Sequence, residues 1–273
     1  MFQGKVCWIT GASSGIGEAL AKQLAGHGAS LILSGRNLAE LDRVNAECGG
    51  NHLVLPFEAT DLAALPGVVD TATRWKGYID GLINNAGISQ RSLAQETDFR
   101  VYQQVIDIDL IAPIALTQAV LPVMLARGRG RIIMIASVAG LVGVPLRTAY
   151  CAAKHGLVGY ADALRGEVAG QGIMVHVVAP GSVKTNVSVN ALGPDGKPRG
   201  YSDDAIESGI DADDAATRIL AGIGANQREI VVAEGMEETI VTLRRTDPNA
   251  AFDLGAALIA QGYAAKMGAA KAD

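Results

Sequence analysis

Tyr150 and Lys154 have the residue types and the spacing of an acid–base pair. Lys154 lies four positions after Tyr150, so on a helix the two side chains share one face, a turn apart. A phenol ordinarily loses its proton near pH ~10, and a close cation favours the phenolate and lowers that pKa. Tyr150 is therefore a candidate general acid or base; the alternative is an ordinary surface pair on a helix.

A serine lies where it could assist this pair. Ser137 follows the apolar run 132–135 and precedes Tyr150 by thirteen positions. If the run is a buried parallel strand, Ser137 lies at its carboxyl end, where ligands bind in such sheets. Its hydroxyl could then donate a hydrogen bond to a developing alkoxide.

The elements that would position these side chains alternate along the chain. Short apolar runs are typical of strands buried on both faces, and patterns of helical period lie between them. This alternation predicts an α/β fold: one doubly wound, Rossmann-type domain over residues 1–273, with a seven-stranded, mostly parallel sheet and helices on both faces. The predicted strands are 6–9, 31–33, 53–55, 82–83, 132–135, 175–179 and 230–233, and the predicted helices after the first are about 38–47, 61–75, 98–126, 148–170 and 213–225.

Two stretches depart from this alternation. Residues 184–212 are rich in Gly, Pro, Asn and Asp and leave the sixth strand on the side where ligands bind. We predict a substrate lid there, with a merely mobile insertion as the alternative. Residues 234–273 are alanine-rich and predict a helical C-terminal extension that makes an oligomer contact or covers the pocket.

Composition excludes several classes of protein. The chain of 273 residues is 49% apolar and 19% charged, which supports one large core. Its net charge of −5 argues against a nucleic-acid partner. Three cysteines and four histidines show no paired or ligand-like spacing, so we predict no disulfide, no metal site and a reducing compartment. We see no export signal and no long apolar run, and therefore predict a cytoplasmic protein with no membrane contact.

A glycine-rich loop lies between the first predicted strand and the first predicted helix. Residues 10–17 read T-G-A-S-S-G-I-G. Glycines at this place permit a tight turn and let backbone N–H groups approach a pyrophosphate at the helix N-terminus. The position within a strand–helix–strand unit is the context that dinucleotide binding requires.

The end of the second predicted strand indicates which dinucleotide binds. A carboxylate there would bind the ribose 2′-hydroxyl of NAD, whereas an arginine suits the 2′-phosphate of NADP. The chain has Arg36 and Asn37 after Ser34-Gly35, and no acid. We therefore predict NADP (NADPH), with an ordinary surface arginine as the alternative.

Asn84-Asn85-Ala86-Gly87 follows the fourth predicted strand. Such residues could line a cofactor floor or could simply form a turn, and their chemistry alone does not separate the two.

These motifs together resemble the short-chain dehydrogenases/reductases. The resemblance rests on T-G-x-x-x-G-x-G at 10–17, N-N-A-G at 84–87, Ser137, Y-x-x-x-K at 150–154 and P-G at 180–181, in family order and spacing. It covers about residues 4–233. The details are most similar to the NADP-preferring branch that includes steroid- and retinoid-handling reductases.

The resemblance implies a role for each matching residue. Tyr150 would be the acid/base, Lys154 would lower its pKa and bind the nicotinamide ribose, and Ser137 would hydrogen-bond the substrate oxygen. Asn84 and Gly87 would border the adenosine and ribose, and Thr185 would touch the carboxamide or the phosphates. The predicted cofactor-binding residues are Gly11, Ser13, Ser14, Gly15, Ile16, Gly17, Arg36, Asn37, Asn84, Ala86, Gly87, Lys154, Pro180, Gly181, Val183 and Thr185.

Two positions depart from the family pattern. Asp109 lies where the family usually has the asparagine of a Ser–Tyr–Lys–Asn set, and we include it with Ser137, Tyr150 and Lys154 as a predicted catalytic residue. A carboxylate near Lys154 would stabilise the ammonium and weaken its field at Tyr150. We therefore expect Asp109→Asn to keep or raise activity. The second departure, Glu58-Ala59 in place of Asp and a branched apolar residue, is mild.

The substrate follows from the expected pocket wall. Residues 88–91, 138–147 and the lid should supply it, and the apolar side chains of 141–146 favour a hydrophobic ketone, aldehyde or secondary alcohol. The long apolar helices 98–126 and 148–170 predict a homodimer or homotetramer. The alternatives are a non-catalytic dinucleotide-binding sensor, which would not need the Tyr–Lys pair, and an epimerase or dehydratase, which usually has a larger C-terminal region.

Overall fold

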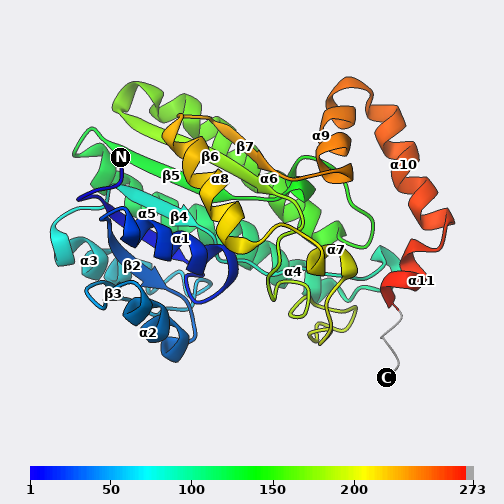
Figure 1. Ribbon diagram of the computed structural model, residues 1–273, viewed down its shortest axis with the longest axis horizontal. Coiled ribbons are helices and arrows are strands. Elements are labelled where there is room, and N and C mark those ends of the chain that lie inside the picture. The colour runs from blue at the N-terminus through cyan, green and yellow to red at the C-terminus, as the bar shows by residue number, and fades with distance from the viewer. Residues whose placement is uncertain (269–273) are drawn as a thin grey trace.

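The protein forms one seven-stranded sheet in which every strand is parallel to its neighbours (Figure 1). The computed structural model describes residues 1–268. The strand order is β3-β2-β1-β4-β5-β6-β7. The strands are β1 (Val6–Thr10), β2 (Ser30–Ser34), β3 (Leu53–Val54), β4 (Gly81–Asn84), β5 (Gly130–Ile135), β6 (Ile173–Pro180) and β7 (Glu229–Val232). This confirms the predicted doubly wound α/β fold.

Helices cover both faces of the sheet. On one face α1 (Gly15–Gly26), α2 (Leu38–Glu47) and α8 (Ala212–Gly224) pack into one hydrophobic core. On the other face α3 (Leu65–Lys76), α5 (Ala112–Leu125) and α6 (Thr148–Val168) pack into a second core. Consecutive residues of β1 divide between the two: Trp8 lies in the second core and Ile9 in the first. The strands are buried on both faces, which is why their sequences are continuously apolar.

The predicted helix 98–126 is interrupted by a widened turn. It consists of α4 (Phe99–Ile106), a π-helical turn (Asp107–Ile111) and α5, which together run without a break. The N–H of Ala112 bonds the carbonyl of Asp107, five residues earlier. Such insertions change the direction in which side chains point and are frequent at functional sites.

This continuous helix modifies the expectation that no long apolar segment exists. The segment Phe99–Leu125 has 27 residues and a mean hydropathy of 1.9 over its most apolar window, so by length and composition it could cross a membrane. Within the protein, 39% of that window is buried. The core helix of a water-soluble protein passes the same test, so the finding is weak evidence for a membrane span.

The two stretches outside the alternation have their own structure. The segment between β6 and α8 is mostly irregular and contains the single turn α7 (Asp204–Glu207). The C-terminal extension forms α9 (Met236–Thr246), α10 (Pro248–Ala260) and α11 (Tyr263–Gly268), which project from one end of the domain (Figure 1). Val241 of α9 packs with Val138 and Val142, which follow β5.

Candidate active site

A large cavity opens at the carboxyl ends of the strands. Its volume is about 730 Å³, and it is lined by residues that follow β1, β2, β4, β5 and β6 and by the segment between β6 and α8. In the strand order, β1 has β2 on one side and β4 on the other, so the chain leaves β1 toward one edge of the sheet and leaves β4 toward the opposite edge. Ligands of doubly wound folds bind at such a switch point.

The glycine-rich loop forms one end of this cavity. Gly11 and Gly15 have φ values of +64° and +56°, a region that other residues seldom adopt. A Cβ on Gly17 would lie 2.1 Å from the carbonyl oxygen of Gly11. The side chain of Ser14, the N-cap of α1, makes no capping hydrogen bond within the described residues. Backbone N–H groups of the first turn therefore remain for an anionic ligand.

Thr10 and Asn85 hold this loop against β4. The Asn85 side-chain amide donates to the carbonyls of Thr10 and Gly11 at 3.0 and 3.1 Å. The Thr10 hydroxyl oxygen accepts from the backbone N–H groups of Asn85 and Ala86 at 3.0 and 3.1 Å. Neither residue was among the predicted site residues. A polar side chain at the carboxyl end of each of two neighbouring strands is the sequence signal that could have identified them.

Arg36 lies on the cavity wall at the end of β2. Its side chain is exposed and makes no ion pair within residues 1–268. Asn37 also lies on the wall, and its side chain accepts a hydrogen bond from the N–H of Glu40 as the N-cap of α2. The free guanidinium and the first turn of α1 are groups that can bind anions, and the cavity has room for a dinucleotide.

Lys154 is buried at the centre of the site, close to Tyr150. Its ammonium nitrogen lies 3.1 Å from Oδ2 of Asp109 and donates to the carbonyl of Ile135 at 3.1 Å. The same nitrogen is 5.6 Å from the centroid of the Tyr150 ring. Tyr150 and Lys154 lie one turn apart on α6, as predicted, and both line the cavity.

Asp109 is fully buried on the π-helical turn. Its Oδ1 accepts from the backbone N–H of Ile88 at 2.8 Å. Burial raises the pKa of this carboxyl above its usual range, against the opposing effect of Lys154. Burial alone would lower the pKa of Lys154, but the Asp109 carboxylate and Tyr150 raise it above the ordinary value. Lys154 is therefore a cation at neutral pH, with the Asp109 carboxyl group in contact.

Gly87 makes the close approach of these two charges possible. A Cβ at this position would lie 2.9 Å from Oδ2 of Asp109 and 3.4 Å from the Lys154 nitrogen. Any other residue would have to displace one of them.

Ser137 caps the short turn that follows β5. Its hydroxyl donates to the carbonyl of Pro180 at 3.2 Å and accepts from the N–H of Ala139 at 3.1 Å. The side chain is almost buried and lines the cavity together with Tyr150. A substrate oxygen would compete with Pro180 for the serine proton.

Nearly all of the predicted residues line the cavity, with two differences. Asn84 lies beneath the floor, where its amide donates to Thr117 and to the sulfur of Met134, and Gly17 packs behind the loop. The residues brought together on the wall are Gly11, Ser13, Ser14, Gly15, Ile16, Arg36, Asn37, Ala86, Gly87, Asp109, Ser137, Tyr150, Lys154, Pro180, Gly181, Val183 and Thr185.

The apolar wall differs from the expected one. Of the residues expected beside the substrate, Ile88 lines the cavity, but Leu141, Val142 and Val144 pack with α9 instead. The C-terminal extension covers them, which the sequence of 138–147 alone could not show. The segment between β6 and α8 supplies apolar side chains to the cavity wall: Val187, Leu192, Pro198 and Ile206.

A buried charge cluster anchors that segment. The carboxylate of Asp203 accepts from Arg91 at 2.8 Å and from Arg199 at 2.6 Å, and Arg147 lies 4.0 Å away. Arg199 also donates to the carbonyl of Met267 at 2.6 Å, which ties the segment to α11. Arg91, expected on the pocket wall, is thus engaged in holding the segment in place.

The fold agrees with the comparisons with known proteins. The family model described as short chain dehydrogenase matches residues 5–193. The chain belongs to the short-chain dehydrogenase/reductase family, and is an oxidoreductase that uses a nicotinamide dinucleotide and a small-molecule substrate.

Proteins of similar sequence or structure occur in several organisms. Dehydrogenase/reductase SDR family member 7B of Danio rerio is 36% identical over 255 residues, which cover 90% of this chain and 82% of the relative. A short-chain dehydrogenase from Streptomyces avermitilis has a similar structure, with a TM-score of 0.79, 26% identity and coverage of 96% and 99%. A short-chain dehydrogenase/reductase from Burkholderia phymatum, solved in complex with NAD, shares the fold with a TM-score of 0.80, 24% identity and coverage of 91% and 95%.

Proposed function

We propose that this chain transfers a hydride between NADP(H) and a hydrophobic ketone, aldehyde or secondary alcohol, with Tyr150 as the acid/base. The observation that supports this most is the Lys154 ammonium, buried 5.6 Å from the Tyr150 ring in the cavity that also contains Arg36 and the glycine-rich loop. The nicotinamide supplies or accepts the hydride when it is bound. The Tyr150 hydroxyl gives the proton to the carbonyl oxygen on reduction and takes it back on oxidation.

Ser137 and Lys154 prepare this proton transfer. The Ser137 hydroxyl leaves Pro180 and donates to the substrate oxygen, where negative charge develops. The Lys154 cation lies 5.6 Å from the centroid of the Tyr150 ring and would also hold the nicotinamide ribose. The segment 184–212 acts as a lid whose apolar residues exclude water from the reacting atoms.

Turnover separates this enzyme from a dinucleotide-binding sensor on the same fold. We expect a panel of apolar ketones, aldehydes and secondary alcohols to cause oxidation of NADPH or reduction of NADP, followed at the absorbance of the reduced nicotinamide. A sensor would bind NADPH, as a titration of its fluorescence would show, without turnover of any compound.

Arg36 is proposed to select NADP. We expect Arg36→Asp to raise the Kd of NADPH by about tenfold or more, because a charge-assisted hydrogen bond is replaced by repulsion, and to change the Kd of NADH much less. Fluorescence titration with both nucleotides measures this. Arg228→Asp, at an exposed arginine before β7, is the matched control and should change neither Kd. Equal losses for the two nucleotides, or no loss, would contradict the assignment.

The assembly is proposed to be a cytoplasmic homodimer or homotetramer. Two side chains on the segment Phe99–Leu125 support this, because Phe99 is 71% exposed and Ile111 is 39% exposed. Burial of this surface against a second copy, through this segment and α6, removes apolar area from water. A monomer mass by light scattering would rule it out.

A further inference from the structure

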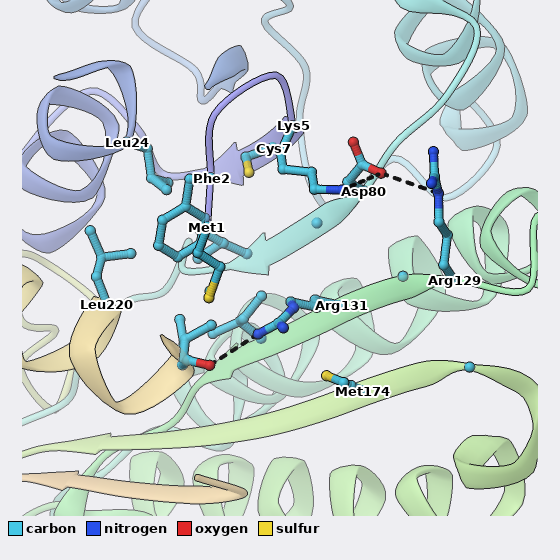
Figure 2. Close-up of a pocket in the computed structure, with 16 residues that line it drawn as sticks. Met1, Phe2, Lys5, Cys7, Leu24, Asp80, Arg129, Arg131, Met174 and Leu220 are labelled. Carbon is cyan, nitrogen blue, oxygen red and sulfur yellow. Dashed lines mark hydrogen bonds and ion pairs between the residues drawn. The ribbon is translucent and has the colours of Figure 1, made fainter. Parts of the chain in front are cut away.

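A second cavity lies at the opposite end of the sheet from the candidate active site (Figure 2). It opens where β1, β4, β5 and β6 begin, and its volume is about 240 Å³. Cys7, near the start of β1, lines this cavity, whereas Thr10, at the end of the same strand, lines the larger one. None of the residues assigned to dinucleotide or substrate binding borders it.

The interior of this cavity is apolar. Phe2, Leu24, Ile133 and Leu220 line it, and Figure 2 shows Phe2 between Leu24 and Leu220 on one side of the space. Burial raises the pKa of the Cys7 thiol to about 12, so this group is neutral and contributes apolar surface. A ligand that binds here must therefore place an apolar part inside.

Gly81 leaves part of this space open, although neither its backbone conformation nor its packing requires a glycine. A Cβ on Gly130 would lie 2.5 Å from the sulfur of Met124, and Gly172 has a φ of +76°, so packing or backbone conformation explains both. Gly81 has neither constraint: a Cβ there would make an ordinary contact, 3.6 Å from the sulfur of Cys7. A larger side chain at position 81 would occupy part of the cavity.

The charges around the cavity are mainly positive. Among residues 1–268, Asp80 is the only acidic side chain that lines it, and its Oδ1 already lies 4.0, 3.3 and 3.8 Å from Lys5, Arg127 and Arg129. Arg131 instead donates to the backbone carbonyl of Ile223 at 3.0 Å and has no carboxylate partner within residues 1–268. Its side chain extends along the cavity beside Met1 (Figure 2).

From these observations we propose that the cavity binds a small amphipathic carboxylate, with its apolar chain over Gly81 and its carboxylate on Arg131. Arg131 has the planar donor arrangement that matches a carboxylate. The volume lies above the ~150 Å³ that holds benzene in an engineered apolar cavity and below the ~300–1,000 Å³ of pockets for drug-sized ligands. A medium-length alkyl carboxylate has the corresponding size.

Octanoate is the probe that tests this site in the full chain. We expect isothermal titration calorimetry to give saturable one-site binding of octanoate, and octan-1-ol, which lacks the charge, to bind about tenfold more weakly. Arg131→Gln should raise the Kd of octanoate by about tenfold and bring it close to that of octan-1-ol. Gly81→Val should prevent binding of both compounds, because it fills the space for the chain.

Controls distinguish this cavity from the candidate active site. Arg36→Gln, the matched change of an arginine in the larger cavity, should leave the Kd of octanoate unchanged, as should saturation with NADPH. Circular dichroism shows whether each variant is folded. If Gly81→Val does not fold, the Kd of octanoate for Arg131→Gln alone decides whether the proposal holds. No saturable binding by the parent protein, or equal binding by the parent protein and Arg131→Gln, overturns the proposal.

Discussion

Replacement of Tyr150 by phenylalanine is expected to lower kcat by about 10²- to 10⁴-fold and to leave the Kd of NADPH nearly unchanged. The change removes only the hydroxyl oxygen that gives or takes the proton, and general acid–base catalysis contributes roughly this factor. The ring remains 5.6 Å from the Lys154 ammonium, so the packing of α6 is preserved. The loss should therefore appear in the chemical step, with little effect on binding or folding.

Tyr102→Phe is the matched control for this variant. The Tyr102 hydroxyl hydrogen-bonds the Thr148 hydroxyl at 2.6 Å, at the start of the same helix, and Tyr102 does not line the larger cavity. Its variant should keep kcat within about threefold of the parent value, since one exposed hydrogen bond contributes little. Single-turnover oxidation of NADPH measures the chemical step in both. A Tyr150→Phe variant that keeps its kcat would show that another group moves the proton.

The positions of the strands along the chain and their parallel direction could be predicted, because strands of parallel sheets are continuously apolar. Each of the seven predicted strands overlaps an observed one, and the sheet is parallel throughout. Glycine and proline mark most of the connections between these elements. The π-helical turn at Asp107–Ile111 has no such signal, because its sequence contains neither glycine nor proline.

Side-chain direction at the end of β4 was harder to predict. Successive residues of a strand point to opposite faces, so Asn84 enters the core beneath the sheet while Asn85 faces the glycine-rich loop. An error of one residue in the predicted register of β4 would exchange the roles of these two asparagines.

The apolar residues 141–144 illustrate a second limit of prediction from sequence. They are covered because α9, about a hundred residues later in the chain, packs against them.

The contact between Asp109 and Lys154 determines what substitutions at position 109 should do. The Lys154 pKa is raised, so the charge on Lys154 contributes stability below the ordinary lysine value of about 10.4, and this contribution is lost as the pH rises through the higher folded-state pKa. Asp109→Asn keeps an oxygen that can accept from the N–H of Ile88. It removes the carboxylate that raises the Lys154 pKa, so burial lowers that pKa and the alkaline limit of activity should move to lower pH. At neutral pH, activity should be kept or raised, since the field of Lys154 at Tyr150 is no longer shared.

Asp109→Leu is expected to lower the free energy of unfolding by about 3–5 kcal/mol, because it leaves the Lys154 ammonium buried without a counter-ion and the Ile88 N–H without an acceptor. Urea unfolding at neutral pH measures this. Addition of Lys154→Met should restore much of the loss, since replacement of both members of a buried ion pair by apolar residues is often close to neutral. The two single variants and the double variant form a cycle that isolates the pair. If the losses simply add, the two charges do not depend on each other, and Asp109 would have to act in the site by some route other than Lys154.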